Sequence, residues 1–392
     1  MATKGIRTTW GSPLFADFVP ATDDLLAARM RAAGGIFIGK TNTPEWGHGS
    51  HSFNPLHGTT LNPYDRSRSA GGSSGGAAAA LAAHLLPVAD GSDMMGSLRN
   101  PAAFCNVYGF RPTWGLVPQD ADGDTFLATL ATDGPMARTV EDLARLLETL
   151  AGPNPEAPCG RPQEPFVDRL DTTLRGKRIG WLADWGGAYA MEPGILSQCE
   201  SALQVFADQG AIVEPVAPPF PAEQLWRAWT TLRAMLNAGR FRLIHDNPDR
   251  RARLKPETLW EIEQGQGLGA AEVHAASTIR SRWYAHAARL FERYAALALP
   301  SVQVWPFPAE WRWPRAINGQ QMDTYHRWME VVVPVSLIGL PSLCLPAGFG
   351  AAGLPTGMQL FGRTGADAAI LAMGHAYHRA TDWPARRPPQ IG

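Results

Sequence analysis

The sequence has few of the features that mark a membrane-spanning or disulfide-stabilised protein. No apolar run reaches the roughly 18 residues that a transmembrane helix needs. The first residues, Met1 to Thr8, lack the apolar region of a signal peptide. The 392 residues include only four cysteines, scattered without a regular framework. We therefore expect free or core thiols and predict a cytoplasmic location.

An excess of charge of either sign is also missing. Lys and Arg number 35 and Asp and Glu 36, which gives a net charge of −1. A chain without a strong bulk field does not attract nucleic acid or an anionic membrane. We expect neither as a partner, so a small molecule is the predicted substrate. A homodimer stays open, because the sequence does not determine the oligomeric state.

Metal and phosphate motifs are missing too. His48, His51 and His57 fall in a polar stretch rich in Gly and Asn, and their spacing does not match the metal-binding His-Glu-x-x-His helix. Loop histidines are the simpler interpretation. A phosphate-binding loop ends in Gly-Lys-Ser/Thr, whereas Gly76 is followed by Ala77. The sequence predicts no metal site and no cofactor.

The sequence is instead distinguished by two Gly/Ser clusters between Ser69 and Arg99. The first runs directly into an Ala-rich helix over 77–84, and an apolar strand over 85–89 precedes the second. Glycine lets backbone amides approach a ligand, and serine supplies a hydroxyl that a base can activate. Ser73 and Ser97 are 24 positions apart. One helix and one strand are enough to bring them together.

Two other interpretations of the first cluster are weaker. A flexible linker is typical of Gly/Ser runs, but this run lies between structured segments. The pattern Gly-x-Ser-x-Gly also fits the nucleophile elbow of other hydrolases, which requires a buried strand immediately before it. The preceding Asn62 to Arg68 is polar and turn-like. The elbow therefore lacks its structural context.

The rest of the chain alternates between helical and extended patterns, which predicts an α/β fold. We expect helices over 25–33, 101–105, 140–150, 193–209, 224–245, 268–294 and 366–381. We expect strands near 36–38, 108–111, 178–183, 211–216, 297–300, 341–346 and 357–362, with Ile36–Ile38 buried. The segments 133–139 and 154–165 are expected to be a turn and a connector. No internal repeat is present.

These blocks resemble the amidase signature family of serine hydrolases. Gly71 to Gly76, the Ala-rich helix and Gly91 to Ala102 resemble its signature. Supporting matches occur at 33–42, 109–115, 133–139, 339–348 and 353–360. The resemblance implies a mixed central β-sheet covered by helices on both faces. It also implies a single domain over 1–392, with a core at 1–150 and 335–385 and a variable, substrate-shaping region at 155–330.

The resemblance implies a serine–serine–lysine mechanism. Ser97 is the expected nucleophile, and Ser73 is the expected bridging serine, joined to Gly72 by a cis peptide bond. Backbone N–H groups of Met94, Met95, Gly96 and Ser97 are expected to form the oxyanion hole. A lysine of lowered pKa would accept the proton through Ser73 and return it to the leaving amine.

Two features depart from the family pattern. Most members have Gly-Gly-Ser at the nucleophile, whereas this chain has Met95-Gly96-Ser97. A backbone donor survives that change, although a positive φ at Met95 would be strained. The alignment on Gly11-Ser12 places the family's lysine before Met1. The lysine-bearing strand is thus expected to be absent, and Lys4 falls in the loop after it.

The leading prediction is an amidase that hydrolyses a non-peptide carboxamide bond to a carboxylate and an amine or ammonia. One alternative is the A-type subunit of an aminoacyl-tRNA amidotransferase, which shares these motifs. The other is a non-catalytic binding protein on the same scaffold, because the expected base is missing. The identity of the substrate amide stays open.

Overall fold

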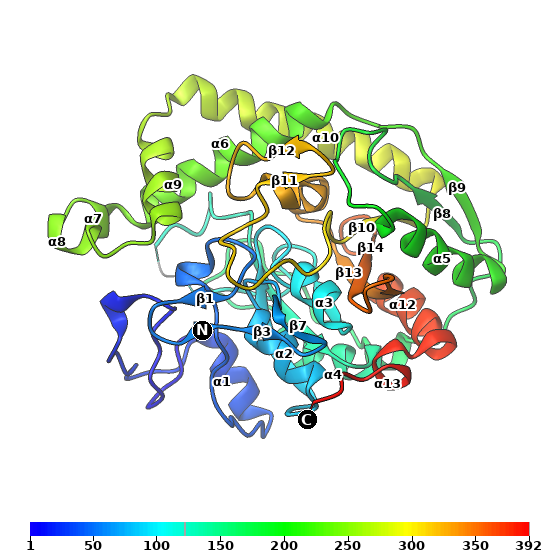
Figure 1. The fold of residues 1–392 in the computed structure, drawn as a ribbon, viewed down its shortest axis with the longest axis horizontal. Coiled ribbons are helices and arrows are strands. Elements are labelled where there is room, and N and C mark those ends of the chain that lie inside the picture. The colour runs from blue at the N-terminus through cyan, green and yellow to red at the C-terminus, as the bar shows by residue number, and fades with distance from the viewer. Residues whose placement is uncertain (121–122, 392) are drawn as a thin grey trace.

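A mixed eight-stranded sheet is the centre of the structure, a computed structural model that describes residues 1–120 and 123–391 (Figure 1). Its strand order is β5-β7-β6-β13-β14-β10-β8-β9. Only the β10–β8 and β8–β9 pairs are parallel. In that order the strands are β5 (Val88–Asp93), β7 (Thr132–Ala137), β6 (Tyr108–Arg111), β13 (Ser342–Phe349), β14 (Pro355–Phe361), β10 (Ala296–Pro300), β8 (Arg178–Trp181) and β9 (Ile212–Pro215).

The two faces of the sheet pack into two separate hydrophobic clusters. Side chains alternate across a strand, so in β10 Leu297 and Leu299 join one cluster while Ala296 and Ala298 join the other. In β13, Cys344 faces the first cluster and Leu343 the second. The predicted fold class, a mixed sheet with helices on both faces, is confirmed.

The first face is covered by α2 (Gly75–Ala82), α3 (Arg99–Cys105), α6 (Ala222–Arg240), α10 (Ala270–Arg293), α11 (Val333–Leu337) and the 3₁₀ segment η4 (Arg327–Val332). The second face is covered by α4 (Val140–Leu150), α5 (Ile195–Asp208) and α12 (Asp367–Thr381). Helix α9 (Pro256–Gln266) packs on α6, which in turn contacts α10 (Figure 1).

The remaining elements are short or peripheral. The helices are α1 (Leu25–Ala32), α7 (Arg242–His245), α8 (Pro248–Arg251) and α13 (Trp383–Arg386), with 3₁₀ turns at η1 (Pro13–Phe15), η2 (Glu45–Gly47) and η3 (Val167–Arg169). Three two-stranded sheets pair β1 (Phe53–Asn54) with β2 (Gly58–Thr59), β3 (Leu61–Asn62) with β4 (Asp65–Ser69), and β11 (Ala316–Ile317) with β12 (Gln320–Gln321).

Most predicted elements form close to their expected bounds because their local signals agree with their packing. Asp24 caps α1 by accepting from the amide of Ala27. Helix α4 buries Leu143, Leu147 and Leu150 on one face. The β8–α5–β9 unit has the parallel geometry expected of a helical crossover. The four cysteines are free thiols.

Four predictions differ from the structure. The strand expected over 85–89 begins only at Val88, and the segment 62–68, expected to be turn-like, contains most of strand β4. The other two concern Ile36–Ile38 and the segment 133–139. Ile36–Ile38 forms no strand, and the exposed fractions of Ile36 and Ile38 are 89% and 72%. No strand among the described residues pairs with this segment, so its backbone has no partner for the hydrogen bonds of a sheet. The expected turn at 133–139 is largely strand β7. Pro135 is tolerated there because β6 pairs only with Met136 and Ala137, so no amide is needed at Pro135 on that side.

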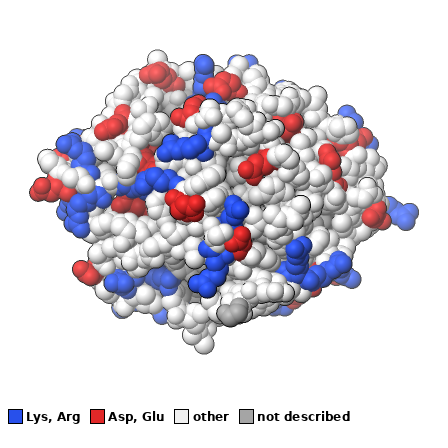
Figure 2. Space-filling model, viewed as in Figure 1, with Lys and Arg blue, Asp and Glu red and all other residues white. Residues whose placement is uncertain are grey.

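The surface carries both signs of charge without a large patch of one sign on the face shown in Figure 2. Lys and Arg side chains alternate with Asp and Glu over that face. Among residues 1–120 and 123–391, every helix is too short or too polar to cross a bilayer.

Candidate active site

The two candidate serines come from segments that the fold brings into contact. Ser73 precedes α2, and Ser97 lies between β5 and α3. The amide of Ser74 donates to the carbonyl oxygen of Ser97 at 3.2 Å. Both serines are buried, with exposed fractions of 4% and 8%. Helix α2 and strand β5 thus connect the clusters as the spacing predicted.

Two further serines hold the Ser73 segment through hydrogen bonds to its backbone. Ser50 donates through Oγ to the carbonyl oxygen of Gly72, and Ser52 donates to that of Ser73 at 3.1 Å. Ser52 Oγ also accepts from the amide of Gly75 at 3.1 Å. The Gly72–Ser73 peptide bond is cis, as the resemblance implies. These contacts hold Ser73 in place and leave its hydroxyl uncommitted, since it bonds to none of the described residues.

Gly96 sets the shape of the loop that carries Ser97. Its φ of +82° lies in the left-handed region, and a Cβ there would lie 2.5 Å from Asn100 Oδ1. The carbonyl oxygen of Gly96 accepts from the amide of Asn100 at 2.6 Å. Met95 does not have a positive φ in this structure. The positive φ falls on the glycine, so methionine is compatible with the loop.

A buried carboxylate holds the same loop from the sheet side. Asp93 accepts from the amides of Gly96 at 2.8 Å and Leu98 at 3.2 Å. It also accepts from Arg99 Nε and Nη2, both at 2.9 Å, and from Arg111 at 3.2 Å. Burial alone would raise the pKa of Asp93, but the two guanidinium groups more than offset it and hold that pKa below its usual range.

Arg99 links this loop to the helical layer above it. Its Nη1 donates to Gln359 Oε1 and its Nη2 to Ser336 Oγ, both at 2.6 Å. Arg99 is fully buried, and so is Asp93. The loop that carries Ser97 is therefore braced against β14 and α11 by charge-assisted hydrogen bonds, which are stronger than neutral ones.

The structure corrects one member of the expected oxyanion hole. The Gly96 amide donates to Asp93 Oδ1 at 2.8 Å, so it is already paired. The nearby carboxylate attracts this N–H because it is charged and at hydrogen-bond distance. The amides of Met94, Met95 and Ser97 make no hydrogen bond within the described residues.

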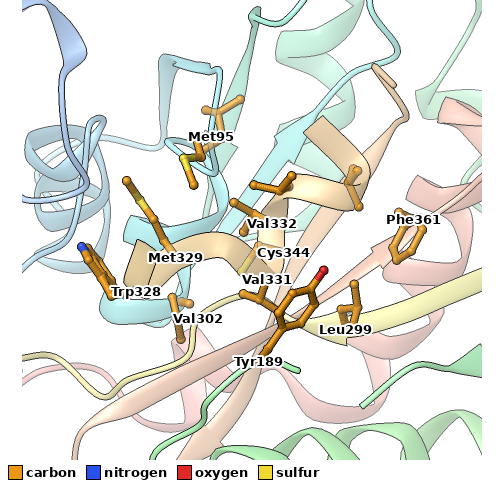
Figure 3. Close-up of a cluster of buried hydrophobic side chains, with 14 of the residues drawn as sticks. Met95, Tyr189, Leu299, Val302, Trp328, Met329, Val331, Val332, Cys344 and Phe361 are labelled. Carbon is orange, nitrogen blue, oxygen red and sulfur yellow. The ribbon is translucent and has the colours of Figure 1, made fainter. Parts of the chain in front are cut away.

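The two methionines of the loop point into different surroundings. Met95 is buried in the first hydrophobic cluster, over the turn that carries Met329 and Val332 (Figure 3). Met94 instead lines a cavity of about 2320 Å³, as do Ser73 and Ser74. Met95 therefore anchors the loop, and Met94 is the methionine that a ligand in the cavity would contact.

The resemblance implies a lysine base that falls before Met1, and two lysines of this chain, Lys40 and Lys4, differ in their position relative to the cavity. Lys40 lines the same cavity as Ser73, and burial lowers its pKa. Its ammonium group donates to the carbonyl oxygen of Met1. Lys4 is exposed and is not among the residues that line the cavity. Among the described residues no lysine is hydrogen-bonded to Ser73.

Sequence reasoning missed the residues that support the two serines. Ser50 and Ser52 lie in a stretch interpreted only as polar loop, where no local signal sets them apart. Asp93 and Arg99 lie within the quoted signature segment, and their six-residue spacing across a turn is the signal that could have identified an ion pair. Groups of three or more metal-ligating side chains are absent from the described part of the chain.

Comparisons with known proteins agree with this geometry. The family model described as Amidase matches residues 1–371, and the chain belongs to this family of amide-cleaving enzymes. It is similar to the A-type subunit of the glutamyl-tRNA(Gln) amidotransferase of Roseiflexus sp. (strain RS-1), with 34% identity over 99% of this chain and 82% of the relative. It is also similar to an acylamidase of Rhodococcus erythropolis, with 32% identity over 99% and 81%.

Solved structures give the same family. A bacterial aryl acylamidase of the amidase signature family matches with a TM-score of 0.91 and 29% identity, over 99% of this chain and 83% of that one. A peptide amidase in complex with the inhibitor chymostatin matches with a TM-score of 0.79 and 30% identity, over 100% and 83%. The amidase prediction is confirmed at this level.

Proposed function

We propose that the chain hydrolyses small, non-peptide carboxamides through an acyl-enzyme on Ser97. The observation that carries the proposal is the hydrogen bond between the Ser74 amide and the Ser97 carbonyl oxygen, which joins the buried Ser97 to the segment that carries Ser73. A serine hydroxyl becomes a useful nucleophile once a neighbouring group takes its proton. We infer that Ser73 relays that proton.

The proposed reaction has two halves. Ser97 Oγ attacks the amide carbonyl carbon and passes its proton to Ser73, which gives its own proton to a base. The tetrahedral oxyanion is stabilised by the amides of Met94, Met95 and Ser97. Collapse breaks the C–N bond as Ser73 returns a proton to the leaving nitrogen. Water then attacks the ester on Ser97, which releases the carboxylate and restores the hydroxyl.

The base that drives Ser73 is expected to act from the large cavity, because Ser73 faces it. On its other sides the Ser73 segment is bonded to Ser50 and Ser52. Lys4 does not line that cavity. We therefore expect Lys4→Ala to leave any amide hydrolysis unchanged.

The substrate class is proposed from the relatives. The matched aryl acylamidase and acylamidase favour an aryl or acyl amide and a small-molecule substrate. The aminoacyl-tRNA amidotransferase alternative is favoured by the sequence identity to the Roseiflexus protein. The TM-score to the solved Thermotoga maritima amidotransferase structure is nevertheless 0.80, against 0.91 for the aryl acylamidase. A cytoplasmic location remains part of the proposal.

Release of 4-nitroaniline from acyl 4-nitroanilides tests the function. Relative to the unaltered protein, we expect a loss of about 10³-fold or more in Ser97→Ala and a large loss in Ser73→Ala. Ser197→Ala is a matched control, since Ser197 lies on the exposed face of α5. Activity retained in Ser97→Ala would contradict the proposed nucleophile, and glutamine hydrolysis without anilide hydrolysis would favour the amidotransferase alternative.

A further inference from the structure

A buried guanidinium group approaches the nucleophile loop from the variable region. Arg233 of α6 has an exposed fraction of 4%. Its Nε donates to Glu261 Oε1 at 2.6 Å, and its Nη2 donates to the Tyr325 hydroxyl at 2.9 Å. That hydroxyl donates in turn to Glu261 at 2.6 Å. Two sides of the guanidinium group are thus fixed by strong, buried partners.

The third side of the guanidinium group contacts the loop that carries Ser97. Arg233 Nη1 lies 3.2 Å from Met94 Sδ, the thioether sulfur of the loop that carries Ser97. A thioether is a weak hydrogen-bond acceptor, and methionine is flexible. Met94 also lines the large cavity beside Ser73. Met94 therefore separates a poorly satisfied donor from the space where a substrate would bind.

The positive charge of Arg233 is already compensated by Glu261, so a further negatively charged group is disfavoured as its ligand. Glu261 carries the compensating negative charge and also accepts from Asn237 at 3.0 Å. Burial lowers the pKa of His48 to about 3 and that of His326 to about 4, so both are neutral at pH 7. A substrate carboxylate would be a second, unpaired buried negative charge, which is costly. A neutral carbonyl oxygen carries no such penalty.

We propose that Arg233 is a specificity residue that donates from Nη1 to a second carbonyl oxygen on the acyl side of the amide substrate, with the Met94 thioether moving aside. The acyl side is chosen because the Met94 amide belongs to the proposed oxyanion hole, which holds the acyl carbonyl group. The favoured substrates are therefore amides of N-acylated amino acids. This inference rests on the proposed function.

A matched pair of substrates tests the inference. Acetylglycyl 4-nitroanilide has a second carbonyl group, and pentanoyl 4-nitroanilide has an acyl chain of the same length without one. We expect kcat/KM to favour the acetylglycyl compound by about tenfold or more, as expected for one hydrogen bond to a charged donor. In Arg233→Met the ratio should approach one. Arg227→Met, on the solvent side of the same helix, should keep the wild-type ratio.

One further variant and one binding measurement distinguish a role of Arg233 in substrate specificity from a role in stabilising the fold. A purely structural Arg233 would lower both rates together and leave their ratio unchanged, which would overturn the inference. Arg233→Lys retains a positive charge beside Glu261, so it guards against misfolding, and its ratio should also fall. Calorimetric Kd values for both anilides in a Ser97→Ala background test Arg233 without catalysis. Equal Kd values there contradict the inference, whereas absent hydrolysis with unequal Kd values contradicts only the proposed function.

Discussion

At the scale of single residues, Gly96 has little freedom to change. Its positive φ and the nearby Asn100 amide both exclude a side chain. The sequence predicted that glycine and the serine beside it mattered, because Gly/Ser clusters carry chemistry. It could not predict that the Gly96 amide is taken by Asp93, since that depends on how the loop folds back on the carboxylate.

We expect Gly96→Ala to destabilise the protein by at least about 1–2 kcal/mol, the cost of a left-handed conformation in a residue with a Cβ. The contact with Asn100 should add to this and lower activity further. Unfolding in urea and anilide hydrolysis measure the two effects. Gly39→Ala is the matched control, because its φ is not in the left-handed region and nothing lies within 4 Å of the added Cβ. Equal stability of the two variants would be inconsistent with this account.

At the scale of elements, sequence patterns predicted helices and strands well where local propensity and packing agree, as in α4 and β8–α5–β9. They failed at Ile36–Ile38 and at β7. An apolar run becomes a strand only when a partner strand is present, and the sequence does not identify the partner. A segment that contains proline can form a strand when the neighbouring strand makes no hydrogen bond at the proline. Whether it does depends on the tertiary structure.

The Asp93–Arg99 ion pair joins β5, the loop that carries Ser97 and α3, so its loss should lower the stability of all three elements together. Asp93→Asn leaves the Arg99 and Arg111 guanidinium groups without a buried counter-charge. We expect a loss of about 3–5 kcal/mol in unfolding free energy. Urea unfolding followed by tryptophan fluorescence measures it. Glu141→Gln, which breaks the exposed pair with Arg145, is the control and should have no measurable effect. Similar losses of unfolding free energy in the two variants would show that the ion pairs of Asp93 contribute little to stability.

At the scale of the whole molecule, buried histidines couple folding to pH. His51 bonds through Nδ1 to Ser69 Oγ at 2.7 Å and through Nε2 to the carbonyl oxygen of Ala309 at 3.0 Å. Burial lowers the pKa of His51 to about 4. The unfolded chain, with a histidine pKa near 6.5, binds the proton more readily. The stability that neutral His51 contributes is present above that value and is lost as the pH falls toward 4.

We therefore expect His51→Gln to weaken the pH dependence of folding. Between pH 7 and pH 5 the wild type should lose about 2 kcal/mol more unfolding free energy than the variant does. Buried carboxyl groups with raised pKa values make folding more favourable as the pH falls, which is opposite to the effect of His51. They contribute equally to both proteins, so subtracting the change in the variant from the change in the wild type removes their contribution. His57→Gln is the control, because His57 lies in an exposed turn. Parallel pH profiles for wild type and His51→Gln would show that His51 titrates normally in the folded state.

The fold class, the family and the nearness of the two serines could be predicted from the sequence, since Gly/Ser spacing and ordered blocks are local information. The roles of Ser50 and Arg233 could not, because both act through partners distant in the sequence. The single-domain organisation over 1–392 remains a prediction.

The central claim is that Ser97 is the nucleophile and Ser73 its proton relay. The most direct measurement is reaction of the protein with a fluorophosphonate probe, followed by peptide mapping by mass spectrometry. We predict one adduct, on Ser97, that is absent in Ser97→Ala and slower to form in Ser73→Ala. An adduct on Ser73, or undiminished labelling in Ser97→Ala, would contradict the account.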